Sequence, residues 1–133
     1  MASAQWSGTL GSVTGVTATT LVQVSPASGL QRVLPNTFAS HAMFGLSTTS
    51  VVAGQTWTIA IQSRVIGTTF KIAEVAGIGG AQFNRVIPIV NTTGTTQSDF
   101  VGVPTPTHVL FTGSSAGIGL TFSAVVTGVL QAI

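Results

Sequence analysis

Few side chains in this sequence could carry acid–base or nucleophilic chemistry. Glu74 and Asp99 are its only carboxylate residues, and a glycosidase-like reaction would need both of them across one cleft. They fall in different segments, so two separate surface charges are the simpler interpretation. A Ser-His-Asp set could be assembled from His41 or His108, Asp99 and the serines of TGSSAG, but the chain has no Gly-x-Ser-x-Gly elbow. The sequence therefore predicts no catalytic residue and a protein that is not an enzyme.

Metal and cofactor sites are equally poor in candidate ligands. The chain has two His, no Cys and two acidic residues, and His41 and His108 lack the close spacing typical of metal ligands. The glycine-rich stretch AGIGGAQ has neither the Gly-Lys-Ser/Thr ending of a phosphate-binding loop nor the Gly-x-Gly-x-x-Gly spacing. We therefore expect no metal-binding residue and no cofactor, and we place the histidines at strand edges or interfaces.

The scarcity of charge is the strongest feature of the composition. Only 5% of the residues are charged, against roughly 25% in ordinary soluble domains. Ser and Thr take their place at about a quarter of the chain, while hydrophobic residues make up a normal 44%. A neutral surface of this kind promotes association. The composition therefore predicts that partners cover much of the surface, beginning with other copies of the chain.

The four basic residues do not form a cluster in the sequence. They are Arg32, Arg64, Lys71 and Arg85, and the formal net charge is +2. Nucleic-acid-binding proteins gather Lys and Arg to neutralise several phosphates, so we expect no nucleic-acid partner. The N-terminal MASAQWSGTL has no positive region followed by an apolar one, so it does not resemble a secretory signal.

The apolar tail from Ala116 to Ile133 raises the question of a membrane anchor. A spanning helix needs about 20 continuous apolar residues, usually with charged flanks, and this tail has neither. Its apolar residues alternate with hydroxyl residues instead, which is the pattern of a strand with one buried face. We therefore predict a strand and no membrane partner. The apolar positions are Ile118, Leu120, Phe122, Ala124, Val126 and Leu130.

The same alternation recurs along the chain. It is clearest in TWTIAIQSRVI, and it is also present in VTGVTATTLVQV, TFASHAMFGL and FNRVIPIV. In VTGVTATTLVQV it predicts one strand over residues 13–24. Pro88 in the last of these cannot donate a ladder hydrogen bond, which predicts an edge or bulged strand. Shorter strands are expected in LQRVL, TTFKIAEV and HVLF, and strand alternation would place Lys71 and Glu74 on opposite faces. The residues from Asn91 to Thr107 are expected to form a long surface loop.

These strands, with turn sequences between them, predict an all-β fold. We expect a single-domain β-sandwich or jelly-roll-like barrel of seven to nine short strands. Residues 1–12 are assigned to an N-terminal arm and residues 13–133 to the domain. Trp57 lies in the strongest strand and is expected in the core. Trp6 lies outside any clear period, and it could either dock the arm on a neighbouring subunit or fold back onto its own domain.

The whole chain resembles the decoration (cement) proteins of tailed-bacteriophage capsids. The features shared are the Cys-free, charge-poor composition, the uncharged segment MASAQWSGTLGS, the hydroxyl-faced strands and the apolar last strand LTFSAVVTGVLQAI. The resemblance implies a homotrimer that binds the major capsid protein on the outer surface of the virion, bridges neighbouring capsid subunits and is made in the host cytoplasm. Candidate interface residues are Trp6, Arg32, Arg64, Lys71 and Arg85.

Two other functions remain open from the sequence. One is a carbohydrate- or receptor-binding module of a phage tail or fibre, for which the stretch from Asn91 to Asp99 is the only candidate loop. The other is the coat protein of a small virus, although such proteins usually carry a basic arm or face that this chain lacks.

Overall fold

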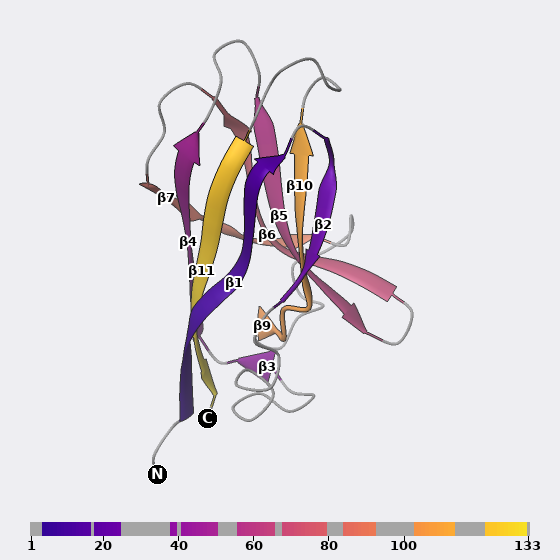
Figure 1. Ribbon diagram of the computed structural model, residues 1–133. Helices are drawn as coiled ribbons and strands as arrows, with labels where there is room; N and C mark the ends of the chain where they lie inside the picture. Colours follow the sequence, from indigo (N-terminus) through magenta and orange to yellow (C-terminus); the bar gives the residue numbers. More distant parts are fainter. Residues whose placement is uncertain are drawn as a thin grey trace.

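The computed structural model consists of β-strands and connecting segments (Figure 1). It describes residues 4–16, 18–24, 38–39, 41–50, 56–65, 68–79, 84–92, 103–113 and 122–132. Eleven strands lie in these ranges, and no helix does. They are β1 (Ala4–Val16), β2 (Thr20–Gln23), β3 (Phe38–Ala39), β4 (His41–Ser50), β5 (Trp57–Val65), β6 (Thr68–Ile78), β7 (Asn84–Ile87), β8 (Ile89–Thr92), β9 (Val103–Pro104), β10 (His108–Gly113) and β11 (Phe122–Ala132).

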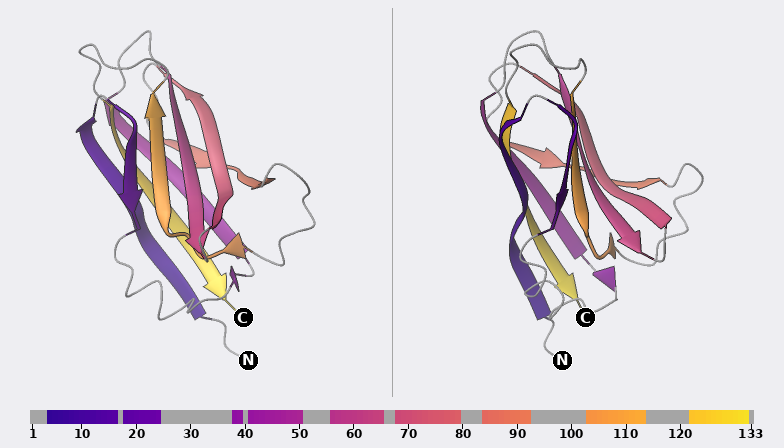
Figure 2. Two further views of the ribbon diagram at one scale, coloured as in Figure 1. Left: turned by 90° about the vertical axis from the view of Figure 1, so that its right-hand side faces the viewer. Right: turned by 45° about the vertical axis from the view of Figure 1, so that its right-hand side comes forward.

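Two antiparallel sheets pack face to face (Figure 2). One has four strands in the order β1-β11-β4-β7, and the other has five in the order β2-β10-β5-β6-β8. The short strands β3 and β9 form a separate pair at the end of the molecule where β1 begins (Figure 1). The predicted all-β sandwich is confirmed, with nine strands in the two main sheets.

The strand pairs are nested from the two ends of the chain toward its middle. The strand β1 pairs with β11, β2 with β10, β4 with β7, and β5 with β6. The chain therefore has the connectivity of one long hairpin whose strands are folded over to form the two sheets, which is the jelly-roll arrangement.

The core fills the space between the sheets with the apolar positions that the alternation marks. Trp57, Ile59 and Ile61 on β5 are 1%, 0% and 0% exposed, so the predicted core position of Trp57 is confirmed. On β11 the predicted buried residues Phe122, Ala124, Val126 and Leu130 all face this core. The tail is a strand over Phe122–Ala132, while Ile118 and Leu120 lie outside the described residues.

The predicted N-terminal arm over residues 1–12 is wrong for the part that the structure describes. From Ala4 onward the chain belongs to β1, which pairs with β11 from Ala4 opposite Ala132 to Val16 opposite Phe122. The register shifts by one residue between Thr9 and Gly11 and again before Val16. Each bulge reverses the phase of the alternation, which explains why the segment shows no clear period in the sequence.

The single strand predicted over residues 13–24 is divided between the two sheets. Gly15 adopts a φ of 63°, a conformation that other residues rarely adopt, and its amide donates to Ser123 Oγ at 2.8 Å. The Thr20 hydroxyl then donates to the Ala18 carbonyl at 2.9 Å. The chain turns between these points, so that β1 ends in the four-stranded sheet and β2 begins in the five-stranded one.

Pro88 also marks a crossing between the sheets. The residues before it form β7 at the edge of the four-stranded sheet, and those after it form β8 at the edge of the five-stranded sheet. The Pro88 carbonyl accepts a hydrogen bond from the Glu74 amide at 3.2 Å. The predicted edge position of this proline is therefore confirmed. The expected surface loop over Asn91–Thr107 is shorter than predicted, because Asn91 and Thr92 complete β8, and residues 93–102 lie outside the described residues.

Candidate functional site

The candidate interface residues that the structure describes do not form one site. Arg64 and Lys71 lie on neighbouring strands β5 and β6 of the five-stranded sheet, whereas Arg85 lies on β7 of the other sheet. Arg32 lies outside the described residues. Trp6 is only 6% exposed and belongs to the core of its own domain, so the docking role proposed for it is wrong and the alternative, folding back onto its own domain, is correct.

Arg64 and Lys71 both lie near Gln62 on the outer face of the five-stranded sheet. Gln62 stands opposite Lys71 on one side and His108 on the other. Its side-chain oxygen accepts a hydrogen bond from Arg64 Nε at 3.1 Å. Gln62 is 8% exposed, so the surrounding side chains cover it and hold its amide in place. We call the group formed by Gln62, Arg64, Lys71, Glu74, Thr107 and His108 the charged patch.

Lys71 and Glu74 form an ion pair within this patch, with Lys71 Nζ 2.9 Å from a Glu74 carboxylate oxygen. The expectation that they point to opposite faces is wrong. Ile61 pairs with Ala73 and Gln62 with Lys71, so Ile72 is an extra residue in β6. This bulge returns positions three apart to the same face. Both side chains are about one-third exposed, and a pair of this exposure stabilises the fold by only about 0.2–1 kcal/mol.

Thr107 fixes the position of His108 and of the Arg64 backbone. Its hydroxyl accepts from the Arg64 amide at 2.8 Å, and it lies 2.9 Å from His108 Nδ1. Its own amide donates to the Gln62 carbonyl at 2.8 Å, and its carbonyl accepts from the Val24 amide at 2.9 Å. These bonds connect β2, β5 and β10 at one level of the sheet.

Burial, and after it the positive charge of Arg64, lowers the pKa of His108 from its ordinary value of 6.5. The neutral ring is therefore favoured at pH 7. With Lys71 and Glu74 neutralising one another, Arg64 gives the charged patch a net positive charge. Such a surface suits an acidic partner. The sequence pattern did not assign Gln62, Thr107 or His108 to this surface, because these residues come together only through the pairing register of the strands.

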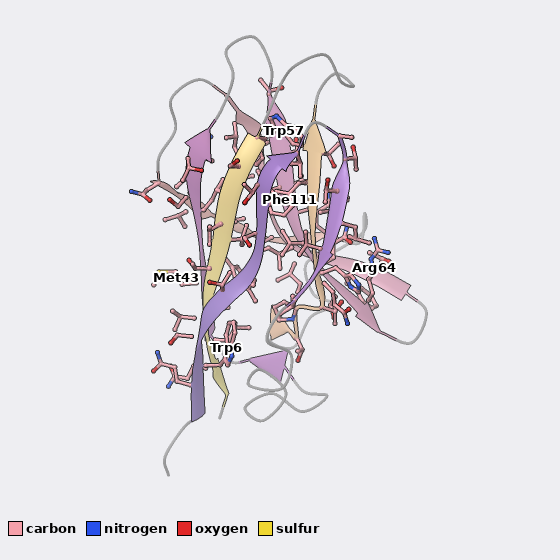
Figure 3. The ribbon with its side chains drawn as sticks, in the orientation of Figure 1. Trp6, Met43, Trp57, Arg64 and Phe111 are labelled. Atoms are coloured by element: carbon pink, nitrogen blue, oxygen red, sulfur yellow. The ribbon has the colours of Figure 1, made fainter. Side chains whose placement is uncertain are left out.

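The opposite surface of the molecule has a different character. It is the central part of the outer face of β1, β11, β4 and β7, and we call it the neutral face; it consists of Ser7, Thr9, Ser12, Met43, Gly45, Ser47, Asn84, Val86, Val125, Thr127 and Val129. None of these carries a charge. Met43 and Val86 are 63% and 66% exposed. Figure 3 shows Met43 projecting from one side of the sandwich and Arg64 lying on the other.

The neutral face also contains a shallow depression of about 490 Å³. It surrounds Gly45, which has no side chain, and its walls come from β4, β7 and β11. The lining residues are Gly45, Leu46, Ser47, Asn84, Arg85, Val86 and Thr127. The sequence held a signal for this face, because Met43, Val125 and Val129 are apolar residues on strand faces that also carry hydroxyl residues such as Ser47 and Thr127.

Within the described ranges, no three His, Cys, Asp or Glu side chains come together as a metal site would require. In the same ranges the structure has no helix of the length and apolar character that a membrane span needs. In comparisons with known proteins, no family model, no curated protein and no solved structure matches the chain.

Proposed function

We propose that the protein is a non-enzymatic structural protein of a virus particle, which binds the outer surface of the capsid shell and bridges neighbouring capsid subunits. The observation that carries the proposal is the separation of the two outer faces, one charged and one neutral, on a jelly-roll sandwich. Jelly rolls are common in viral capsids. A charge content of 5% suits a protein whose surface is covered in an assembly.

In this proposal the charged patch meets acidic groups of the major capsid protein. Arg64 supplies the net positive charge, and Gln62 holds its guanidinium through Nε, while the terminal nitrogens of a guanidinium are the groups that pair with a carboxylate side by side. One exposed ion pair is worth about 1 kcal/mol at most. A copy that contacts two neighbouring capsid subunits makes its second contact within the same complex, so it stays bound although each contact is weak.

The test is co-sedimentation with shells prepared without this chain. We expect the wild-type protein to pellet with the shells, and Arg64→Gln to weaken binding up to about fivefold. Arg85→Gln is the matched control, because it removes the same charge from the other sheet and should bind as the wild type does. A protein that stays in the supernatant would refute the shell-binding function.

The jelly-roll topology gives one rival function its support, namely a coat protein that forms the shell itself. Electron microscopy of the purified protein separates the two proposals, because a coat protein assembles closed shells without any other component. The carbohydrate-binding alternative has less support. Both tryptophans of the chain, Trp6 and Trp57, lie in the core, and the chain has no tyrosine, so aromatic platforms for sugar rings are few.

A further inference from the structure

We infer that the neutral face is a self-association surface, on which two copies of the chain pack about a two-fold axis with Met43 of each copy in the depression beside Gly45 of the other. This inference is independent of the shell-binding proposal, because the two functions use opposite faces of the sandwich. It therefore survives or fails on its own evidence.

The first support is the position of the exposed apolar side chains. Met43 stands directly opposite Val129 in the pairing of β4 with β11, and Val86 stands directly opposite Gly45 in the pairing of β4 with β7. Their exposed fractions are 63% for Met43, 37% for Val129 and 66% for Val86. Met43 and Val129 thus form one apolar pair, and Val86 lies on the neighbouring strand, diagonally across from Met43. Water contact with these three side chains is removed when a second surface covers them.

The second support is that the face carries both a protrusion and a matching depression. Met43 and Gly45 are two residues apart on β4, which places them about 7 Å apart along the strand. A Cβ atom at position 45 would come within 3.1 Å of Thr127 Oγ1, so glycine keeps this floor open. Methionine is flexible and adapts its shape to such a site. Two-fold packing requires a patch to be complementary to itself. The neutral face meets this requirement, because it carries both the protruding Met43 and the depression that would receive the Met43 of the other copy.

The third support is the chemistry of the remaining positions. Ser7, Thr9, Ser12 and Thr127 carry hydroxyl groups, and a hydroxyl both donates and accepts hydrogen bonds. Two identical hydroxyl-rich faces can therefore satisfy one another. A charged partner would instead bury its charges against groups that cannot neutralise them. Arg85 lines the depression from the edge strand β7, where it lies at the rim of the contact.

The size of the face suits a weak, reversible dimer. Strand spacing and rise give each outward residue about 33 Å², so the neutral face covers on the order of 360 Å² per copy, or about 720 Å² for the pair, which is in the range of transient contacts. Two sheets packed face to face lie about 10 Å apart, as they do inside a sandwich. A face-to-face contact has two-fold symmetry and gives two chains, which differs from the trimer that the resemblance implies.

The mass of the purified protein tests the inference by analytical ultracentrifugation over a range of concentrations. We expect two chains for the wild type and one chain for Met43→Lys and for Val86→Lys. The matched control is Leu21→Lys, which places the same charge at another exposed apolar residue, 43% exposed, on the opposite sheet. It should remain a dimer. A wild-type monomer, a trimer, or a dimer that persists in Met43→Lys would overturn the inference.

Disulfide cross-linking tests the geometry directly, because the chain has no cysteine of its own. A Met43→Cys chain mixed with a Val86→Cys chain should cross-link on oxidation, since Val86 forms a wall of the depression. A Met43→Cys chain mixed with a Leu21→Cys chain should not. Equal cross-linking in the two mixtures would contradict the proposed packing, and unchanged thermal melting of each variant confirms that it is folded.

Discussion

Trp57 and Phe122 stack on one another although they belong to different sheets. Their ring centroids are 4.7 Å apart and their planes differ by 14°. Trp57 comes from β5 of the five-stranded sheet and Phe122 from β11 of the four-stranded sheet. Phe111 approaches the same Phe122 ring at 6.2 Å in a tilted arrangement. This aromatic cluster therefore connects the two layers of the sandwich at its core.

Removing one ring of the stack should be costly. We expect Phe122→Ala to lower the free energy of unfolding by about 3–5 kcal/mol, because it removes a fully buried ring and leaves a cavity between the sheets. Urea unfolding followed by tryptophan fluorescence measures this loss, since Trp57 reports on its own partner. Phe122→Leu keeps part of the volume and should cost distinctly less; an equal cost for both would contradict the packing argument.

A substitution at Gly15 would strain the backbone without creating a steric clash of the new side chain. Its φ is 63°, and a Cβ atom there would meet nothing within 4 Å. Gly15→Ala should therefore destabilise the fold by about 1–2 kcal/mol through the left-handed conformation alone. Gly15→Asn should cost less, because asparagine tolerates this conformation. The two variants are compared by chemical denaturation, and an alanine variant as stable as the wild type would refute the assignment.

The ion pair between Lys71 and Glu74 should contribute little to stability. We expect Glu74→Gln to lower the free energy of unfolding by less than about 1 kcal/mol, because both side chains are partly exposed to solvent. The difference from the wild type should shrink further in about 1 M salt, which screens exposed charges. A loss of several kcal/mol at high salt would show that the carboxylate has a structural role beyond this pair.

His108 should make the stability depend on pH. Its pKa in the folded protein is lowered, first by burial and then by Arg64, so the unfolded chain takes up a proton at a higher pH than the folded chain does. The stabilisation is complete above pH 6.5, the ordinary pKa, and is lost as the pH falls through the lower folded value. Thermal melting from pH 8 to pH 4 should show this loss, and it should be smaller in His108→Gln.

The cause of the shift can be separated by nuclear magnetic resonance. The chain has two histidines, so the imidazole signal that disappears in His108→Gln identifies this residue. Its pKa should rise in Arg64→Gln without reaching 6.5, because the charge is the smaller cause and burial remains. A pKa unchanged in Arg64→Gln would mean that the guanidinium does not act on the ring.

The strands that keep a regular period could be predicted from the sequence. In β11 the buried residues fall at every second position, and in β5 the large apolar residues Trp57, Ile59 and Ile61 do the same, because each strand is paired on both sides and its inner face is fully covered. The strands β1 and β6 contain bulges, and these change which positions face the core. The sequence pattern therefore missed β1 at Trp6 and placed Lys71 and Glu74 on opposite faces.

The two candidate surfaces depend on information that a local pattern does not hold. Lys71 lies next to Gln62, the side-chain partner of Arg64, only because β5 and β6 pair in one particular register. The exposure of Met43 depends on which layer β4 joins and on what covers that layer. Alternation distinguishes the two faces of a strand, but for a chain with so few charges it does not distinguish a face covered by a partner from one covered by water.

The nested pairing of the strands also sets the order in which the protein can be built. The strand β11 lies between β1 and β4, so neither can find this neighbour until Phe122–Ala132 has been synthesised and released. The strand β1 therefore stays without its partner strand until almost the last residues of the described chain have been made. Contacts that span the whole sequence close slowly, on the order of milliseconds to seconds. We expect the four-stranded sheet to close last, after Phe122–Ala132 has left the ribosome.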